Sequence, residues 1–241
     1  EPAAPAQGRF PKVLEAFAAL GAQPQAVLYH DDGCDDTRRR LLDFDAVLVW
    51  VNPEEGGRDR SRLDAMLGEV AAEGVFVSAH PDAILKMGTK EVLYRTRTMG
   101  WGCDTHLYRS IEEMRRNLPS QLRGGARVLK QYRGHGGDGV WKVELADETL
   151  PLAAANSNGT HPADVSVRVR HAKRGSIQEQ IPLGAFCKRC APYFEGEGRM
   201  IDQAYQPRLP EGMIRCYLVR DVVGGFGHQA INALYPAPAG A

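Results

Sequence analysis

The sequence predicts an α/β layer followed by an α+β region, and two observations lead to this prediction. In residues 1–79, amphipathic helical segments alternate with short apolar runs, the pattern of a parallel sheet covered by helices on both faces. From residue 80 onward, β-rich runs with alternating side chains become frequent, which is typical of antiparallel strands. A chain of 241 residues is long enough for about two domains.

Residues 1–79 are expected to form the N-terminal α/β domain. Apolar residues from Phe10 to Leu20 recur at helical spacing, and Gly21 follows as a natural stop. The run 26–29 predicts a strand, the polar stretch 36–43 a helix, and the run 46–51 a second buried strand. A further amphipathic helix covers about 63–71 and ends before Gly74, ahead of a strand at 75–78.

The rest of the chain is expected to form two α+β subdomains, residues 80–145 and 146–241. A helix is predicted around 89–99, a strand at 105–109, and a helix from Ser110, where Ser110 and Glu113 match a capping box. The runs 126–132 and 139–145 are joined by glycine-rich residues 133–138 as in a hairpin. Residues 147–162 suggest a surface loop. Further strands are predicted at about 165–169, 198–205, 212–220 and 222–231.

The charge balance argues against a polyanionic partner. Lys plus Arg and Asp plus Glu both number 30, so no global field favours nucleic acid or an anionic membrane. No apolar run approaches the roughly 20 residues of a membrane span, and no secretory signal opens the chain. We therefore expect a cytoplasmic protein with no nucleic-acid or membrane partner, and a homodimer on the general frequency of symmetric dimers.

The cysteines do not predict a disulfide framework. Their number, five, is odd, and the chain has a single C-x-x-C pair, Cys187 and Cys190. That pair fits half of a zinc site or a redox pair. No second pair follows, however, and no histidine lies at a zinc-finger spacing from it. Ordinary, partly buried thiols are the plainer interpretation.

The most informative segment is the glycine-rich run after residue 133. It matches G-x-G-x-x-G, but a dinucleotide fingerprint must lie between a strand and a helix N-terminus, whereas these glycines lead into another strand. No Gly-Lys-Ser/Thr ends the loop, so the Walker pattern is absent. Gly134, Gly136, Gly137 and Gly139 would instead let backbone N–H groups approach phosphate oxygens. We expect such a loop to be mobile without ligand, and the plainer alternative is a structural turn.

Two lysines accompany this loop. Lys130 lies in the strand before it, among mostly apolar and aromatic neighbours that do not favour an unpaired ammonium. Lys90 opens a predicted helix 40 positions earlier. For each lysine alone, a solvated surface position is the plainer interpretation. Together with the glycine loop, they suggest a site for an anion.

In their order along the chain, these residues resemble the ATP-grasp superfamily, most closely bacterial glutathione synthetase, or a less characterised bacterial branch of the superfamily. The segment HPDAILKMGTKEVLYRT resembles the part that supplies a first nucleotide-binding lysine, Lys90. Residues 128–140 are similar to the second lysine, Lys130, followed by the glycine-rich lid. Residues 202–207 and the run PEGMIRCYLV resemble the adenine-contacting linker and a strand that carries an arginine, Arg215.

The resemblance implies an ATP-grasp fold, with a pre-ATP-grasp domain and two α+β subdomains that clasp ATP. It further implies a carboxylate–amine ligase that uses ATP and Mg²⁺, takes a small-molecule acid and an amine, and forms an amide through an acylphosphate. Lys90 and Lys130 would bind phosphates, and the four glycines would cover the transferred group. Gln203, Ala204 and Tyr205 would hold adenine, and Arg215 would stabilise charge on the acylphosphate.

The chain departs from the family at the metal site. The family places acidic and Asn metal ligands on late strands, but no acidic residue follows Asp221. We therefore expect the sequence to be incomplete at both ends, with metal ligands unknown. The alternatives are a non-catalytic nucleotide-binding module of the same fold and an unrelated α/β binding protein with a structural hairpin.

One more segment is a candidate for substrate binding. A locally basic run is formed by Arg168, Arg170, His171, Lys173 and Arg174. It could hold a carboxylate-rich substrate, and a solvated strand face is the plainer interpretation.

Overall fold

A computed structural model describes residues 10–52, 54–55, 58–147, 162–173, 175–231 and 233–234. The chain divides into two compact units, one of residues 1–51 and 59–81 and one of residues 52–58 and 82–241. Helices occur with both a parallel and an antiparallel sheet, so the mixed α and β class is as predicted. Within the described residues, no helix is both long and apolar enough to cross a membrane.

The first unit contains three helices, α1 (Pro11–Ala19), α2 (Cys34–Leu41) and α3 (Ser61–Ala72), among its described residues. Its strands β1 (Ala46–Leu48) and β4 (Phe76–Ser78) pair in parallel, as predicted. Glycines with positive φ follow α1 and α3, Gly21 at +84° and Gly74 at +98°, which is the usual end of a helix. The apolar side of α3 packs with Leu41 and Val77 into one core.

Two expectations for this unit were wrong. Residues 26–29 do not form a strand: Val27 and Tyr29 pack against the core while Leu28 is 53% exposed, so the segment alternates as an extended chain without pairing in the described sheets. The two-stranded sheet is also not buried on both faces, because Leu48 and Phe76 are 38% and 63% exposed. In the described chain, one face of this sheet packs on α3. Apolar strands are typical of a sheet buried on both faces, and for that reason burial on both faces was expected here.

The second unit contains a six-stranded antiparallel sheet. Its order is β5-β10-β6-β7-β8-β9, so β10 returns late in the sequence to lie between β5 and β6. Strands from both sides of residue 145 share the sheet, so this sheet crosses the boundary predicted between residues 80–145 and 146–241. The strands are β5 (Thr105–Tyr108), β6 (Arg127–Gln131), β7 (Val140–Leu145), β8 (Ser166–His171), β9 (Gln178–Pro182) and β10 (Met200–Ala204).

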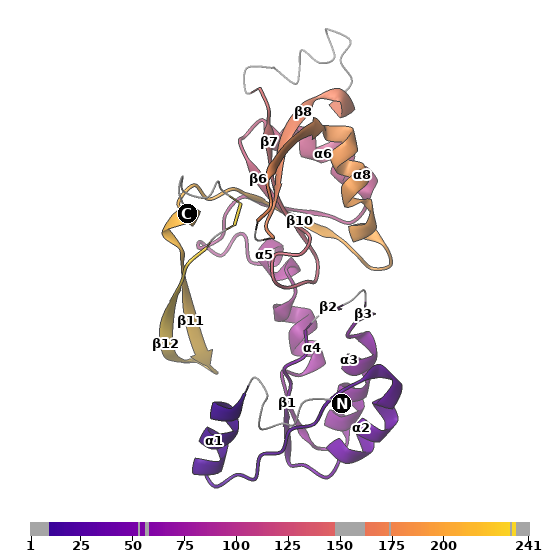
Figure 1. Ribbon diagram of the computed structural model, residues 1–241, viewed down its shortest axis with the longest axis vertical. Helices are drawn as coiled ribbons and strands as arrows, with labels where there is room; N and C mark the ends of the chain where they lie inside the picture. Colours follow the sequence, from indigo (N-terminus) through magenta and orange to yellow (C-terminus); the bar gives the residue numbers. More distant parts are fainter. Residues whose placement is uncertain are drawn as a thin grey trace. The chain divides into compact units, whose positions relative to one another are not determined.

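Helices α6 (Ile111–Leu122) and α8 (Leu183–Cys190) lie side by side on one face of this sheet (Figure 1). The core between them and the sheet includes Met114, Phe186 and Val167. The predicted start of α6 is confirmed, because Ser110 Oγ accepts a hydrogen bond from the Glu113 amide at 3.1 Å. The Glu113 carboxylate accepts from the Arg109 amide rather than from that of Ser110.

Helix α8 and strand β9 were not predicted. The sequence does carry a helical signal here, because four buried residues recur at helical spacing: Leu183, Phe186, Cys187 and Cys190. Both cysteines are free, and burial raises the pKa of the Cys187 thiol to about 11. Both thiols are part of the core under the sheet, where small apolar side chains pack well.

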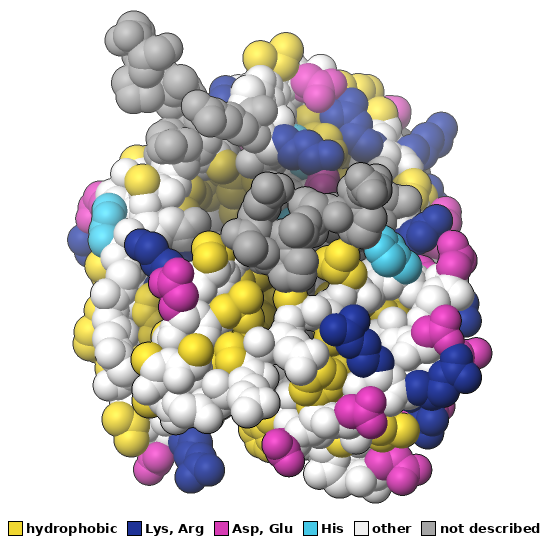
Figure 2. All heavy atoms as spheres, turned by 60° about the horizontal axis from the view of Figure 1, so that its bottom comes forward, with side chains coloured by type: hydrophobic (Ala, Val, Ile, Leu, Met, Phe, Trp, Pro, Cys, Tyr) yellow, Lys and Arg dark blue, Asp and Glu magenta, His cyan; other side chains and the backbone are white. Residues whose placement is uncertain are grey.

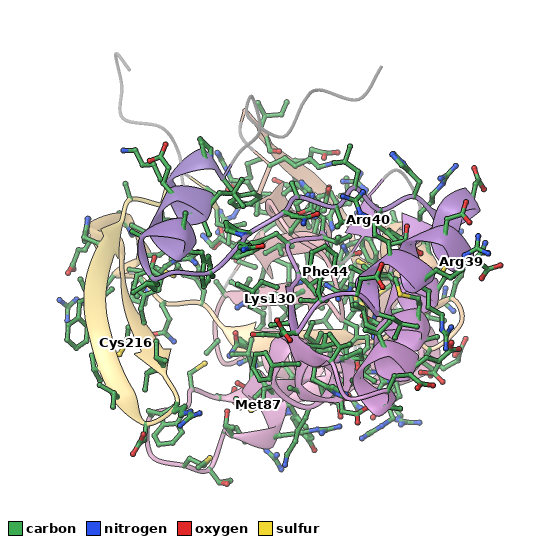
Figure 3. The ribbon with its side chains drawn as sticks, turned by 90° about the horizontal axis from the view of Figure 1, so that it is seen from below. Arg39, Arg40, Phe44, Met87, Lys130 and Cys216 are labelled. Atoms are coloured by element: carbon green, nitrogen blue, oxygen red, sulfur yellow. The ribbon has the colours of Figure 1, made fainter. Side chains whose placement is uncertain are left out.

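Shorter elements complete the described chain. The predicted helix at 89–99 is shorter, α5 (Glu91–Arg95), and follows a π-helical turn, Ile84–Gly88. The predicted strands at 212–231 form a hairpin, β11 (Met213–Val219) and β12 (Val222–Gln229), on which Cys216 lies (Figure 3). The remaining short segments are α4 (Pro81–Ala83), β2 (Glu54–Glu55), β3 (Arg58–Asp59) and single turns at Asp31–Gly33, Pro162–Asp164, Ala191–Phe194 and Leu209–Glu211.

The charged side chains match the balanced composition. On the face drawn in Figure 2, Lys and Arg side chains are for the most part interspersed with Asp and Glu side chains. A charged ligand therefore has to be held by a local group of residues rather than by a general surface field.

Candidate functional site

Two predicted site residues, Lys130 of β6 and Gln203 of β10, lie on the sheet face opposite α6 and α8, which we call the polar face, whereas Ala204 pairs with Arg127 on the covered face. Side chains alternate along each strand, and facing residues of antiparallel partners share a face. Leu129 belongs to the core under the helices, so its neighbour Lys130 points the other way. The strand residues of the polar face are Thr105, Leu107, Val128, Lys130, Val140, Lys142, Glu144, Ser166, Arg168, Arg170, Gln178, Gln180, Pro182, Ile201 and Gln203.

Lys130 is held on a central strand, not on a solvated edge. Its Nζ donates to Gln203 Oε1 at 2.5 Å, and the Gln203 amide nitrogen is directed to Cys103 Sγ at 3.3 Å and Thr105 Oγ1 at 3.2 Å. Burial lowers the pKa of Lys130, and the nearby Cys103 opposes that effect. Among the described residues no carboxylate pairs with this ammonium, so an added anion would stabilise it.

Lys90 lies at the start of α5, next to the C-terminal end of β6. Its backbone N–H donates to Tyr132 O at 3.2 Å, and its Nζ donates to Gly134 O at 3.2 Å. The Arg199 guanidinium supports this junction, because it bonds Glu91 at 2.6 Å and lies 4.3 Å from the centre of the Tyr132 ring. The structure thus brings Lys90 to the glycine loop and places Lys130 on the strand that leads into it.

The glycine loop has a structural requirement for its glycines. All four have positive φ: +136° at Gly134, +61° at Gly136, +88° at Gly137 and +59° at Gly139. A Cβ on Gly139 would lie 2.5 Å from Cγ of the buried Gln131, whereas a Cβ on Gly136 would meet nothing within 4 Å. Close packing accounts for Gly139, and the open surroundings of Gly136 leave room for a ligand against its backbone.

Gly139→Ala should therefore lower the free energy of unfolding by about 2–4 kcal/mol, from left-handed backbone strain plus overpacking. Gly136→Ala should lower it by about 1–2 kcal/mol, because only the backbone strain applies. Urea unfolding of both variants measures the difference. Equal losses in the two would contradict the packing against Gln131.

The loop also contacts the connection between β8 and β9. Asp138 forms an ion pair with Lys173, and the Ala172 amide donates to Val140 O at 2.8 Å. The hydrogen bond from Lys173 lowers the pKa of Asp138, and the same contact raises the pKa of Lys173. The ion pair therefore adds stability above the ordinary Asp pKa and loses it as the pH falls through the lowered value. The expected mobility of the loop stays a prediction.

Asp138→Asn should increase the hydrogen-exchange rates of the loop amides a few-fold, because one exposed ion pair holds the loop weakly. The increase should persist from about pH 5 to about pH 8 once rates are corrected for intrinsic exchange, since Asp138 stays ionised there. High salt should reduce the difference from the parent. A salt-independent difference would exclude the ion pair as its cause.

Ala204 and Tyr205 lie where β10 leaves the sheet. Their backbone N–H groups donate to Asp104 O and Ala126 O, both at 2.9 Å. The Tyr205 ring lies 4.5 Å from Lys142 Nζ, on the polar face. Together with Gln203, these residues adjoin β6, the strand that carries Lys130, and a role in holding adenine stays a prediction.

Among the described residues, Arg215 has no hydrogen bond or ion pair with Lys90, Lys130, Gln203 or the glycine loop. It is exposed on β11, and within the described residues its guanidinium donates to Gln229 of the facing strand β12. The contacts of the hairpin therefore do not support the predicted role of Arg215 in stabilising the charge of an acylphosphate.

A cavity of about 440 Å³ lies beside Gln203. Cys103 and Thr105, which line it, accept hydrogen bonds from the Gln203 amide nitrogen, and Gln203 accepts one from Lys130, so Gln203 connects the cavity wall to Lys130. Neither residue was predicted, because the pairing of β5 with β10 spans nearly 100 residues. The other lining residues are Tyr94, Arg97, Gly102, Asp104 and His106.

The opposite face carries a charged network, centred on the buried Arg127 and Asp202 and reaching the exposed Asp104, that no motif had indicated. Arg127 Nε bonds Asp202 at 2.6 Å and Arg127 Nη1 bonds Asp104 at 2.5 Å, while the Tyr108 hydroxyl donates to Asp202 at 2.5 Å. Burial raises the pKa of Asp202, although the Tyr108 and Arg127 contacts oppose this effect. All of these groups satisfy one another, which indicates a structural role.

The arrangement on the polar face suits an anion: a half-buried ammonium, a second lysine, and a glycine loop beside them, next to a cavity. A scan against protein-family models finds no match for the chain, and a search among curated proteins finds none either.

Proposed function

We propose that the chain is an ATP-dependent carboxylate–amine ligase of the ATP-grasp type, with its nucleotide on the polar face. The observation that supports this most is the convergence on β6: Lys130 lies on the strand, and Lys90 bonds Tyr132 and Gly134 just beyond it. A triphosphate needs cations and backbone N–H donors in one place. The two lysines and the glycine loop would supply them.

In the proposed reaction, the γ-phosphorus of ATP forms a bond to a carboxylate oxygen of the acid while its bond to the bridging oxygen breaks and ADP leaves. The amine nitrogen then bonds to the acyl carbon, phosphate leaves with its oxygen, and the nitrogen loses a proton. Lys90 and Lys130 would neutralise phosphate charge in the first step. The loop from Gly134 to Gly139 would limit the access of water to the acylphosphate.

Mg²⁺ would be expected beside the phosphates, but the described residues do not fit it. They hold no group of three His, Cys, Asp or Glu side chains that could bind a metal ion. Arg127 forms ion pairs with the buried carboxylate of Asp202 and with the carboxylate of Asp104. The proposal therefore assigns no step to a metal ion.

Hydroxylamine offers a direct test, because it attacks acylphosphates and yields hydroxamates. Incubation with ATP, hydroxylamine and a panel of carboxylic acids should produce ADP and hydroxamate together, in amounts that depend on one of the acids. Lys130→Met should form neither above background.

The outcomes separate the candidate functions. Stabilisation by ATP of about 2.7 kcal/mol at 100 times its dissociation constant, without any hydroxamate, would favour a nucleotide-binding module without catalysis. No stabilisation at all would remove both nucleotide functions and leave the glycine loop as a structural turn.

A further inference from the structure

The cavity beside Gln203 lies along an edge of the six-stranded sheet. β5 is the first strand in the order of that sheet, and β10 is its strand neighbour among the described residues. Five of the seven residues that line the cavity are consecutive, from Gly102 to His106, and they lead into and begin β5. Because side chains alternate between the two faces of a strand, a run of consecutive lining residues indicates that the cavity opens onto the backbone edge of β5.

The backbone of Thr105 points away from β10 and toward this edge. The Ala204 N–H donates to Asp104 O at 2.9 Å, which fixes the hydrogen-bond pattern between the two strands. Successive residues of an antiparallel strand direct their backbone N–H and C=O groups to opposite sides, so those of Thr105 have no partner on the described strands. Thr105 is 4% exposed, and an unpaired backbone group at a buried position is costly. A ligand with backbone-type donors and acceptors would satisfy both groups.

The cavity wall also carries a cation that is not balanced by a carboxylate. The Arg97 guanidinium lies 3.9 Å from the centre of the Tyr94 ring, and its Nη1 donates to Tyr94 O at 2.7 Å. No carboxylate of the described residues forms an ion pair with Arg97. The acidic residue of the wall, Asp104, is instead paired with Arg127, and His106 Nε2 lies 3.0 Å from it. The remaining donors of the guanidinium are therefore suited to two parallel hydrogen bonds with an added carboxylate.

Gly102 holds Arg97 next to the start of β5. A Cβ on Gly102 would lie 2.5 Å from Arg97 O, so a glycine is required for the two backbones to approach this closely. The cation therefore lies at the N-terminal end of β5. A peptide that adds to the edge of β5 in the antiparallel direction has its own C-terminus at this end.

We propose that the edge of β5 and Arg97 form a binding site for an extended peptide that ends in a free carboxylate. The peptide would pair with the Thr105 backbone as an additional antiparallel strand, and its terminal carboxylate would bind the Arg97 guanidinium. The cavity of about 440 Å³ lies within the range of about 300–1,000 Å³ that is usual for ligand pockets. The site goes beyond the proposed ligase function and does not depend on it, because Lys130 and the glycine loop take no part in it.

The basic segment 168–174 offers no comparable cation beside a cavity. Arg168 bonds Glu144 at 3.1 Å, Lys173 pairs with Asp138, and Arg174 lies outside the described residues. A role of this segment in binding a carboxylate-rich substrate stays a prediction.

Twenty mixtures of tetrapeptides with a fluorophore on the N-terminus test the site. Each mixture has one of the twenty amino acids at its last position and random residues before it. In fluorescence polarisation at least one mixture should bind the parent, and the same mixture with a C-terminal amide should bind at least tenfold more weakly. Arg97→Met should weaken binding about tenfold, the usual effect of one charge-assisted hydrogen bond. Arg97→Lys should lose less, because it keeps the charge.

N-methylation of a single peptide from the best mixture distinguishes strand addition from an ion pair alone. Methylation of a peptide nitrogen that faces β5 should weaken binding at least tenfold, because it removes a donor and adds bulk at the strand edge. Methylation of the neighbouring nitrogen, which points away from β5, should change the affinity less than about threefold. Equal effects at successive nitrogens would overturn the proposed strand addition.

Arg189→Met is the matched control. Arg189 pairs with Glu179 of β9, the strand at the opposite edge of the sheet, so its removal should leave peptide binding unchanged. Equal losses in Arg97→Met and Arg189→Met would overturn the proposal. Arg97→Met should also leave the midpoint of thermal unfolding unchanged, because Arg97 is exposed. A lower midpoint with undiminished peptide binding would identify Arg97 as a structural residue and overturn the site.

The remaining outcomes also decide. Failure of every mixture to bind, or equal binding of the acid and the amide, overturns the peptide site. Displacement of the peptide by ATP would assign the cavity to the nucleotide instead. Peptide binding by a parent that does not bind ATP would remove the proposed ligase function while the peptide site stands.

Discussion

Lys130→Met should lower the affinity for ATP about 100-fold, because two or more charge-assisted hydrogen bonds to phosphate are lost from a half-buried site. The free energy of unfolding should stay within about 1 kcal/mol of the parent. Burial lowers the pKa of this ammonium, so its removal relieves a desolvation cost while it ends the hydrogen bond to Gln203. Calorimetry with ATP and urea unfolding measure the two quantities.

Lys188→Met provides the control for charge alone, because Lys188 is exposed on α8. It should change ATP affinity less than about threefold, since a distant exposed charge is screened. If Lys130→Met bound ATP like the parent, the nucleotide site on the polar face would be excluded. A loss of several kcal/mol in its unfolding would instead identify Lys130 as a structural residue.

The sequence predicted the elements whose signals are local. Helix α3 has an apolar row and a terminal glycine, and β8 alternates Val167 and Val169 with polar neighbours, so each was found within a residue or two. The order of the sheet could not be found in this way. β10 lies between β5 and β6, and no periodicity reports a pairing between residues about 70 to 100 positions apart.

The site was predictable to the same extent. Lys90, Lys130 and the glycine loop follow one another in a recognisable order; the structure places Lys90 against Gly134 and Lys130 on the strand that leads into the loop, and their common role in binding a nucleotide stays a prediction. Cys103 and Thr105 were not found, because their contacts with Gln203 depend on the pairing of β5 with β10, which no local pattern reports.

Arg127→Met should lower the free energy of unfolding by about 3–5 kcal/mol, because it leaves the fully buried Asp202 carboxylate without its cation. Asp202→Leu in the same chain should restore much of this loss, since an apolar side chain removes the uncompensated charge. Urea midpoints of the single and double variants measure both effects. The exposed pair of Arg189 and Glu179 should contribute less than about 1 kcal/mol to stability by the same method.

The double variant also separates stability from binding. Asp202 is next to Gln203 on β10 but points to the covered face, whereas Gln203 points to Lys130 on the polar face. If the two faces act independently, Arg127→Met with Asp202→Leu should bind ATP within a few-fold of the parent once it is folded. A large loss of affinity in a folded double variant would show instead that the buried network positions Gln203, because adjacent residues of one strand shift together when their backbone moves.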